Sequence, residues 1–257
     1  MSAKRSPYIL YWAAIIGACT MGETAGDYFS FGLNWGYGWT SLILGGTLAI
    51  SLVIDSRLSK RSEVRYWSKI VIMSTAGTAF ADYITRTMGL GYGYGSLFLT
   101  GLFGVVYVVR HFYHGRLRRA GVEILNYTKS DTATGSVPNT DIFYWATIMI
   151  TSTFGTTMGD FVADALGLGF AGGSIFLLSL FTVLVLLDYR RSAAGMVFYW
   201  LALVAASTIG ATSGDFLTKP DGLDLGYTIG SIIVLGFAVV VFLLRKRSLD
   251  SLPATPV

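Results

Sequence analysis

The sequence predicts an all-α membrane protein, a helical bundle of eight transmembrane helices built as four tandem two-helix repeats. Three observations favour this fold class. Of the 257 residues, 53% are hydrophobic and 13% are charged, whereas soluble domains carry about 25% charged residues. Long apolar runs recur along the whole chain and approach the roughly 20 residues that a membrane span needs. In addition, one pattern recurs four times at similar places in these runs.

The recurring pattern begins with a Tyr-Trp pair and ends on an aspartate fifteen residues after the Trp. Its four occurrences are Trp12–Asp27, Trp67–Asp82, Trp145–Asp160 and Trp200–Asp215. Around them we expect repeat 1 at residues 8–55, repeat 2 at 63–112, repeat 3 at 142–190 and repeat 4 at 196–247. Residues 113–141 are polar and predict a cytoplasmic loop between two halves of one transmembrane domain.

Each repeat continues past its aspartate into a Gly-aromatic turn and a second apolar helix. We expect these second helices at roughly 42–54, 97–110, 175–188 and 232–244. Their expected N-cap residues are Ser41, Ser96, Ser174 and Ser231. Helices of this length are short for a membrane span. Either the turns dip below the membrane surface against other protein, or the domain is thin or tilted.

Basic residues mark one end of the expected bundle. Every Lys and Arg except Arg86 and Lys219 lies near a terminus, in the middle connection, or at the ends of every second apolar segment. By the positive-inside rule this end is cytoplasmic, so we expect both termini in the cytoplasm. This placement explains the formal net charge of +4, and we expect the lipid bilayer as partner and no nucleic acid. The four Trp residues would lie at the same interface as aromatic anchors.

A stripe of hydroxyl and carboxylate side chains follows one face of each first helix. If the aspartate is position 0, positions −7, −4, −3 and 0 share that face. In repeats 1 and 2 these positions hold Thr20, Glu23, Thr24 and Asp27, then Thr75, Thr78, Ala79 and Asp82. In repeats 3 and 4 they hold Thr153, Thr156, Thr157 and Asp160, then Thr208, Ala211, Thr212 and Asp215. Gly at −5 and Gly or Ala at −1 predict a close approach of neighbouring helices.

The aspartates are predicted to form a ring. Because each repeat has two spans, all four repeats share one orientation and are related by rotation about the membrane normal. Ionisable side chains at membrane depth face the bundle interior or water, and carboxylate and hydroxyl oxygens suit cations or protons. The sequence therefore predicts a cation transporter or channel, for a divalent metal ion or coupled to protons. The predicted metal ligands are Asp27, Asp82, Asp160 and Asp215.

Two positions break the fourfold pattern. Position +4 holds Phe31, Arg86, Asp164 and Lys219. One interpretation is an ion pair between Arg86 and Asp164 of neighbouring repeats. In a second, Arg86 and Lys219 tune the charge of the ring or gate it, and in a third they extend to the outer interface. Glu23, one turn from Asp27, is the candidate for carrying a proton.

The same residues allow a second hypothesis, in which the protein transports nothing. Each aspartate would accept hydrogen bonds from the turn that follows it, and each threonine would bond within its own helix. The protein would then be a scaffold, a sensor or a complex subunit. The two hypotheses differ in whether the four carboxylates converge. We expect no enzymatic activity and no cofactor, because the sequence has no Ser/His/Asp or Cys/His arrangement suited to covalent catalysis.

The four tandem units, each with two spans, an interfacial Trp and a Thr-x-Gly…Asp core such as that ending at Asp160, resemble a known family. It is the family of bacterial membrane proteins defined by a repeat of unknown function. The resemblance covers nearly the whole chain outside the middle connection and the tail. It implies a location in the bacterial inner membrane and implies no particular activity.

Overall fold

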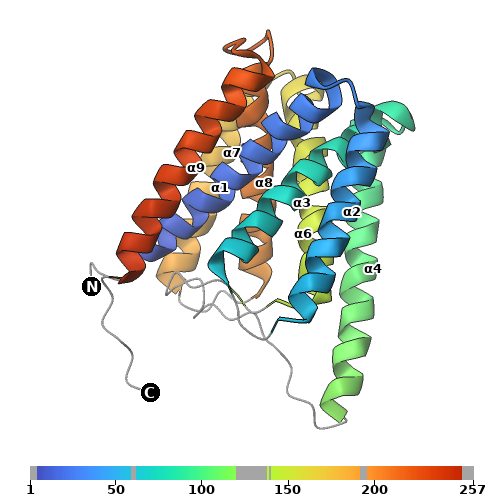
Figure 1. Ribbon diagram of the computed structural model, residues 1–257, viewed down its shortest axis with the longest axis vertical. Coiled ribbons are helices and arrows are strands. Elements are labelled where there is room, and N and C mark those ends of the chain that lie inside the picture. Colours follow the sequence, from blue (N-terminus) through green and yellow to red (C-terminus); the bar gives the residue numbers. More distant parts are fainter. Residues whose placement is uncertain (1–4, 59–61, 120–137, 139, 192–195, 251–257) are drawn as a thin grey trace.

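The computed structural model describes residues 5–58, 62–119, 138, 140–191 and 196–250. Within these residues the chain forms eight α-helices and three short π-helical turns, and no strand. The helices run roughly along one common direction (Figure 1). Five helical segments of the described chain are long and apolar enough to cross a membrane, which indicates a membrane protein.

Four helices form a closed inner ring. Each is the first helix of its repeat, and each packs against the first helices of two other repeats. In order around the ring they are α1 (Arg5–Asp27), α3 (Glu63–Asp82), α6 (Ile142–Asp160) and α8 (Met196–Thr218). Because α8 packs back against α1, the order of the repeats along the chain is also their order around the ring.

The second helices surround this ring. They are α2 (Gly36–Ser56), α4 (Gly91–Arg119), α7 (Gly169–Arg191) and α9 (Gly226–Asp250). Each packs mainly against the first helix of the next repeat rather than its own: α2 against α3, α4 against α6, α7 against α8, and α9 against α1. All four are among the apolar segments, together with α8. They carry most of the exposed large hydrophobic side chains, as expected of surfaces that face lipid.

Small residues bring the inner helices together, as the sequence predicts. Position −5 of every inner helix is a glycine. A Cβ added to this glycine would lie within 3.0 Å of the side chain at position −8 of the next inner helix. The pairs are Gly22 with Ser74, Gly77 with Ser152, Gly155 with Ser207, and Gly210 with Cys19. Position −1 repeats the contact one turn further on, where Gly26 faces Thr78 and Gly214 faces Glu23. The expected close approach is confirmed at every junction of the ring.

The second helices are longer than the sequence suggested. They begin at Gly36, Gly91, Gly169 and Gly226, which have φ values of 70°, 66°, 64° and 69°. These left-handed values suit glycine, so most of each Gly-aromatic segment becomes the first turns of a helix. The helices contain 21, 29, 23 and 25 residues, enough to span a membrane. The expected short helices with serine N-caps are therefore wrong, because each serine lies five residues inside its helix.

The middle connection is partly helical. Helix α4 continues through Arg119, so residues 113–119 belong to a helix and not to the loop expected at 113–141. Residues 120–137 and 139 lie outside the described part of the chain. Helix α6 begins after Asp141, whose Oδ1 accepts a hydrogen bond from the Tyr144 backbone N–H at 2.7 Å. This side chain is the N-cap of the helix.

The glycine contacts yield a stability prediction. Gly155→Ala places a Cβ about 2.6 Å from Ser207 Cβ and against backbone atoms, so the helices must separate, at a cost on the order of 1–3 kcal/mol. We expect a lower melting temperature for the purified protein in detergent, measured by the loss of monodisperse protein after heating. The matched control is Gly104→Ala on α4, where a Cβ meets nothing within 4 Å. Equal melting temperatures for the two variants would contradict the assigned role of the glycine.

Candidate functional site

The four aspartates meet at one end of the inner ring, which we call the aspartate end. Asp27, Asp82, Asp160 and Asp215 are all buried, with at most 3% of each residue exposed. The first three are each followed by a π-helical turn: η1 (Tyr28–Gly32), η2 (Tyr83–Thr87) and η3 (Phe161–Ala165). None of these three aspartates accepts a side-chain hydrogen bond as the cap of its turn. Their carboxylates are directed to other partners.

Two cations lie between the aspartates. Lys219 Nζ is 2.7 Å from Asp215 Oδ1 and 3.7 Å from Asp27 Oδ2. Arg86 Nε is 2.7 Å from Asp82 Oδ1, and its Nη2 is 3.3 Å from Asp160 Oδ2. Each cation therefore joins the carboxylates of two neighbouring repeats, and the four aspartates form two pairs.

This arrangement decides between the interpretations of position +4. The expected ion pair between Arg86 and Asp164 is wrong, because Arg86 turns inward to Asp82 and Asp160. Asp164 instead accepts a hydrogen bond from the Tyr92 hydroxyl at 3.2 Å. The side chain of Lys219 is only 19% exposed, so it does not extend to the outer interface. The Arg86 side chain is 41% exposed, but its guanidinium also lies against buried carboxylates, so the interpretation that remains is two cations that offset part of the acidic charge.

Aromatic rings cover the cations at this end. Lys219 Nζ lies 5.4 Å from the centre of the Phe170 ring, and Arg86 Cζ lies 6.0 Å from that of Tyr92. Phe31, the third occupant of position +4, stacks on Tyr227 at 5.8 Å. Rings at these distances attract cations through their π faces. They narrow the approach to the carboxylates, and the Tyr92 hydroxyl donates to Asp164 rather than to one of the four buried aspartates.

Glu23 forms a second acidic layer, one helical turn below the aspartates. Its Oε2 accepts hydrogen bonds from Thr78 Oγ1 at 2.9 Å and from Thr156 Oγ1 at 2.7 Å. The two threonine hydroxyls are 3.3 Å apart. A single carboxylate on α1 therefore contacts both α3 and α6, and all three groups occupy position −4. This position faces the centre of the ring.

The other threonines of the predicted stripe bond within their own helices. The four at position −7 each donate to the carbonyl four residues earlier, at 2.8–2.9 Å: Thr20 to Ile16, Thr75 to Val71, Thr153 to Met149, and Thr208 to Val204. At position −3, Thr24 donates to Met21 O and Thr157 to Thr153 O. Thr212 bonds to Thr208 O and also accepts from Ser174 of α7 at 2.9 Å. Within the stripe, only positions −4 and 0 bring polar groups from different inner helices together.

A smaller acidic group stands out within the site. One carboxylate oxygen each from Glu23, Asp27 and Asp215 lie within 4.8 Å of one another, and all three residues are buried. Asp82 and Asp160 are not part of this group, because their carboxylates turn towards Arg86. The predicted ring of four ligands is therefore divided into a half with three carboxylates around Lys219 and a half with two around Arg86.

At the opposite end of the inner ring, which we call the tyrosine end, four tyrosine hydroxyls form a closed ring of hydrogen bonds. The successive oxygen distances are 3.0, 2.7, 2.8 and 2.9 Å around Tyr11, Tyr66, Tyr144 and Tyr199, back to Tyr11. Sequence reasoning did not identify these residues as functional. The signal is present, however, because each is the Tyr of the Tyr-Trp pair, sixteen residues before its aspartate.

The tryptophans of the pattern complete the tyrosine end. Each tyrosine ring lies against the Trp of the next repeat, with centroids 5.7–5.8 Å apart: Tyr11 with Trp67, Tyr66 with Trp145, Tyr144 with Trp200, and Tyr199 with Trp12. Trp12, Trp67 and Trp145 are at most 8% exposed. The expectation that they anchor the protein at the membrane surface is therefore wrong. Instead, they pack against the tyrosines that form the ring.

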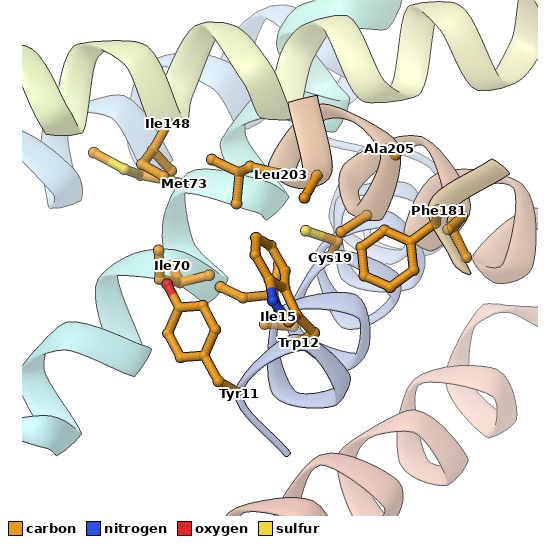
Figure 2. Packing of buried hydrophobic residues seen from close by; sticks show 14 of the residues in the cluster. Tyr11, Trp12, Ile15, Cys19, Ile70, Met73, Ile148, Phe181, Leu203 and Ala205 are labelled. Carbon is orange, nitrogen blue, oxygen red and sulfur yellow. The ribbon is translucent and has the colours of Figure 1, made fainter. Parts of the chain in front are cut away.

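Apolar side chains fill the inner ring between the threonines at position −7 and the tyrosine end. Position −12 holds Ile15, Ile70, Ile148 and Leu203, all at most 3% exposed. They belong to one buried cluster with Met73 and with Tyr11 and Trp12 of the tyrosine end (Figure 2). The inner ring is thus acidic at one end, apolar in the middle and closed by hydroxyl groups at the other end. It is not an open pore in this conformation.

A cavity of about 410 Å³ lies beside Tyr66 at the tyrosine end. Its polar lining includes Asp55, Arg65, Lys69 and Asp141. Asp55 pairs with Lys69 and, at 2.7 Å, with Arg65. Lys69 Nζ also lies 4.5 Å from the centre of the Trp145 ring. A cavity with both polar and apolar lining residues therefore reaches one tyrosine of the ring, Tyr66, between α2, α3 and α6.

A family model described as Repeat of Unknown Function (DUF347) matches the chain four times. The matched residues are 10–61, 65–116, 143–194 and 198–249. No curated protein and no solved structure matches the chain. The four matches correspond to the four helix pairs whose first helices build the acidic site and the tyrosine ring. Since they cover most of the sequence, the protein belongs to the family defined by this repeat of unknown function.

Proposed function

We propose that the protein is a membrane cation carrier that binds its substrate at the aspartate end. The observation that carries this proposal is the convergence of five buried carboxylates, from all four repeats, at one end of the inner ring. Ionisable groups inside a membrane bundle are costly and usually serve a transport pathway. The carboxylates also leave their neighbouring turns uncapped, which argues against a purely structural role as turn caps.

A carrier fits this geometry better than a channel. Below Glu23 and the threonines at position −7, the inner ring is filled by apolar side chains at position −12 and closed by the tyrosine hydroxyls. A cation bound among the aspartates can therefore reach the other side only after the inner helices move. The cavity beside Tyr66 gives the opposite side its own approach to the ring, as alternating access requires.

The substrate proposed is a divalent metal ion, or a cation moved in exchange for protons. Carboxylate and threonine oxygens are ligands of hard cations. Lys219 and Arg86 offset two of the five carboxylate charges, which leaves the site anionic if all five are ionised. Glu23 is the proposed proton carrier, because it lies deepest and the hydrogen bonds recorded to its carboxylate come from two neutral hydroxyls.

The proposal includes a topology. All eight helices would cross the membrane, the tyrosine end would face the cytoplasm and both termini would lie inside. Basic residues near the tyrosine end support this orientation, among them Arg65, Lys69 and Arg245. The family resemblance favours the inner membrane of a bacterium.

The same ion pairs also support a second candidate function, a membrane scaffold or complex subunit. Lys219 ties the fourth repeat to the first, and Arg86 ties the second to the third. In that case the acidic groups would serve only to close the ring of repeats. A transport assay separates the two candidates.

Transport is tested with purified protein in liposomes that contain a dye sensitive to Mn²⁺ and, in a parallel set, a dye sensitive to pH. Asp215→Asn is expected to lower Mn²⁺ uptake at least about tenfold, because it removes a buried carboxylate of the proposed site. The matched control, Asp221→Asn, removes an exposed carboxylate from the turn after α8 and should transport normally. Wild-type vesicles that move neither Mn²⁺ nor protons in either direction would favour the scaffold.

The tyrosine ring predicts a second effect. Tyr66→Phe removes one hydroxyl and leaves two buried neighbours each short of a hydrogen bond, which destabilises the closed ring by about 1–3 kcal/mol. We expect a lower melting temperature and a faster passive leak of cations from the same vesicles. Tyr94→Phe, which alters an exposed tyrosine of α4, serves as the control. If both variants leak like the wild type, the hydroxyl ring is not the barrier.

A further inference from the structure

We propose that the metal site is the group of Glu23, Asp27 and Asp215, and that Lys219 is a tethered cation that occupies it when no metal is bound. This inference rests on the proposed function and narrows it. It assigns the substrate cation to one half of the acidic end rather than to the ring of four aspartates. It also assigns Lys219 the role of an internal competitor.

The spacing of the oxygens fits a single ion. Oxygens on opposite sides of a cation bound at 2.3–2.6 Å are about 4.6–5.2 Å apart. The three carboxylate oxygens of this group lie within 4.8 Å of one another. They can therefore surround one divalent ion with side-chain movements alone, provided that the ammonium group of Lys219 leaves.

Two of these oxygens depend on a cation in this structure. Asp27 Oδ2 and Asp215 Oδ1 are buried, and in the described part of the chain they have no recorded donor beside them other than the ammonium group of Lys219, just as Asp82 Oδ1 has none other than Arg86. The cation recorded beside them is Lys219 Nζ, at 3.7 and 2.7 Å. Buried carboxylate oxygens without a hydrogen-bond donor are costly unless a positive charge lies beside them. When Lys219 moves away, another cation has to take its place or the carboxylates have to bind protons.

The third ligand is held in position from across the ring. The hydroxyls of Thr78 and Thr156 both donate to Glu23 Oε2. A Cβ at Gly214 would lie 2.7 Å from Glu23 Cβ, so α8 also limits where this side chain can go. Glu23 occurs in only one of the four repeats, which explains why only one half of the acidic end has three carboxylates.

The two cations of the aspartate end differ in how they hold their carboxylates. Arg86 lies within the π-helical turn η2, and its planar guanidinium bridges Asp82 and Asp160 through two nitrogens. Lys219 is the first residue after α8, followed by Pro220, and holds its carboxylates through one ammonium group on a flexible chain. Arg86 is suited to be a permanent clamp, and Lys219 is suited to move outward when a stronger cation arrives.

Displacement lowers the net negative charge of the site by one, from −2 to −1 if all three carboxylates are ionised. With Lys219 bound, one positive charge faces three carboxylates, and a divalent ion in its place supplies two. The ammonium group that leaves enters the solvent at the aspartate end. After the ion is released, its return satisfies the carboxylates again, so the empty carrier does not keep three unpaired acids inside the membrane.

The test is Mn²⁺ binding to the full-length protein in detergent, followed by electron paramagnetic resonance of the free ion. Glu23→Gln is expected to weaken binding at least about tenfold, because a charged ligand is lost while the amide oxygen still accepts from Thr78 and Thr156. Asp82→Asn, in the other half, is expected to weaken it by no more than about threefold. Asp221→Asn is the control variant and is expected to bind Mn²⁺ like the wild type.

The lysine is tested by its own pair of variants. Lys219→Gln is expected to bind Mn²⁺ at least about tenfold more tightly than the wild type, because no internal cation has to be displaced. Arg86→Gln removes the same charge from the other half and is expected to change affinity much less. If Lys219→Gln does not fold, the comparison of Glu23→Gln with Asp82→Asn still decides the location of the site.

The outcomes separate this inference from the proposed function. Equal weakening by Glu23→Gln and Asp82→Asn would show that the acidic ring binds as a whole, which overturns the half-site but leaves a cation carrier. Tightening by Arg86→Gln equal to that by Lys219→Gln would overturn the competitor role. If neither the wild type nor Lys219→Gln binds or transports Mn²⁺ or protons, the carrier proposal fails together with the inference.

Discussion

The close contact between neighbouring inner helices is the constraint on which the rest of the structure depends. At each junction a glycine at position −5 admits the side chain at position −8 of the next helix, so the backbones approach more closely than larger residues would allow. Because the contact recurs at the same position in every repeat, the helices are held in one register. That register places the four aspartates in one layer, the −4 groups in the next and the tyrosines in another. A shift of one helix would separate Glu23 from Thr78 and Thr156.

The outer helices make this arrangement compatible with lipid. Each packs on the first helix of the following repeat, so every inner helix is covered by a segment from another part of the chain. The covered helices can then carry carboxylates, threonines and glycines, while the apolar surface is supplied by α2, α4, α7 and α9. Because the outer helices face lipid and the inner helices carry polar groups, α1, α3 and α6 are absent from the apolar segments of the described chain. Their composition is set by what they face inside the bundle.

Sequence periodicity predicted much of this organisation but not which side chains contact one another. The all-helical repeats, the glycine contacts and the inward-facing aspartates all follow from residue types at fixed spacing. Positions −4 and −3 lie about 40° and 60° to either side of the aspartate around the helix, so helical phase alone places Thr157 and Thr212 on the same face as Thr156. The partner of Arg86 depends on which repeats are neighbours and on the local π-helical turn. The tyrosine ring was missed because an aromatic pair near a membrane surface usually signals an anchor.

The ring of tyrosine hydroxyls has a cooperative character. Each hydroxyl has a single proton, so all four bonds form only when every group donates in the same sense, clockwise or anticlockwise. One hydroxyl cannot reverse without leaving one neighbour with two donors and another with none. Rotation of any one tyrosine out of the plane breaks two of the four bonds at once and weakens the remaining two, since hydrogen bonds in a chain polarise one another. The movement of one tyrosine at this end is therefore felt by all four repeats, although the ring consists of only four oxygen atoms.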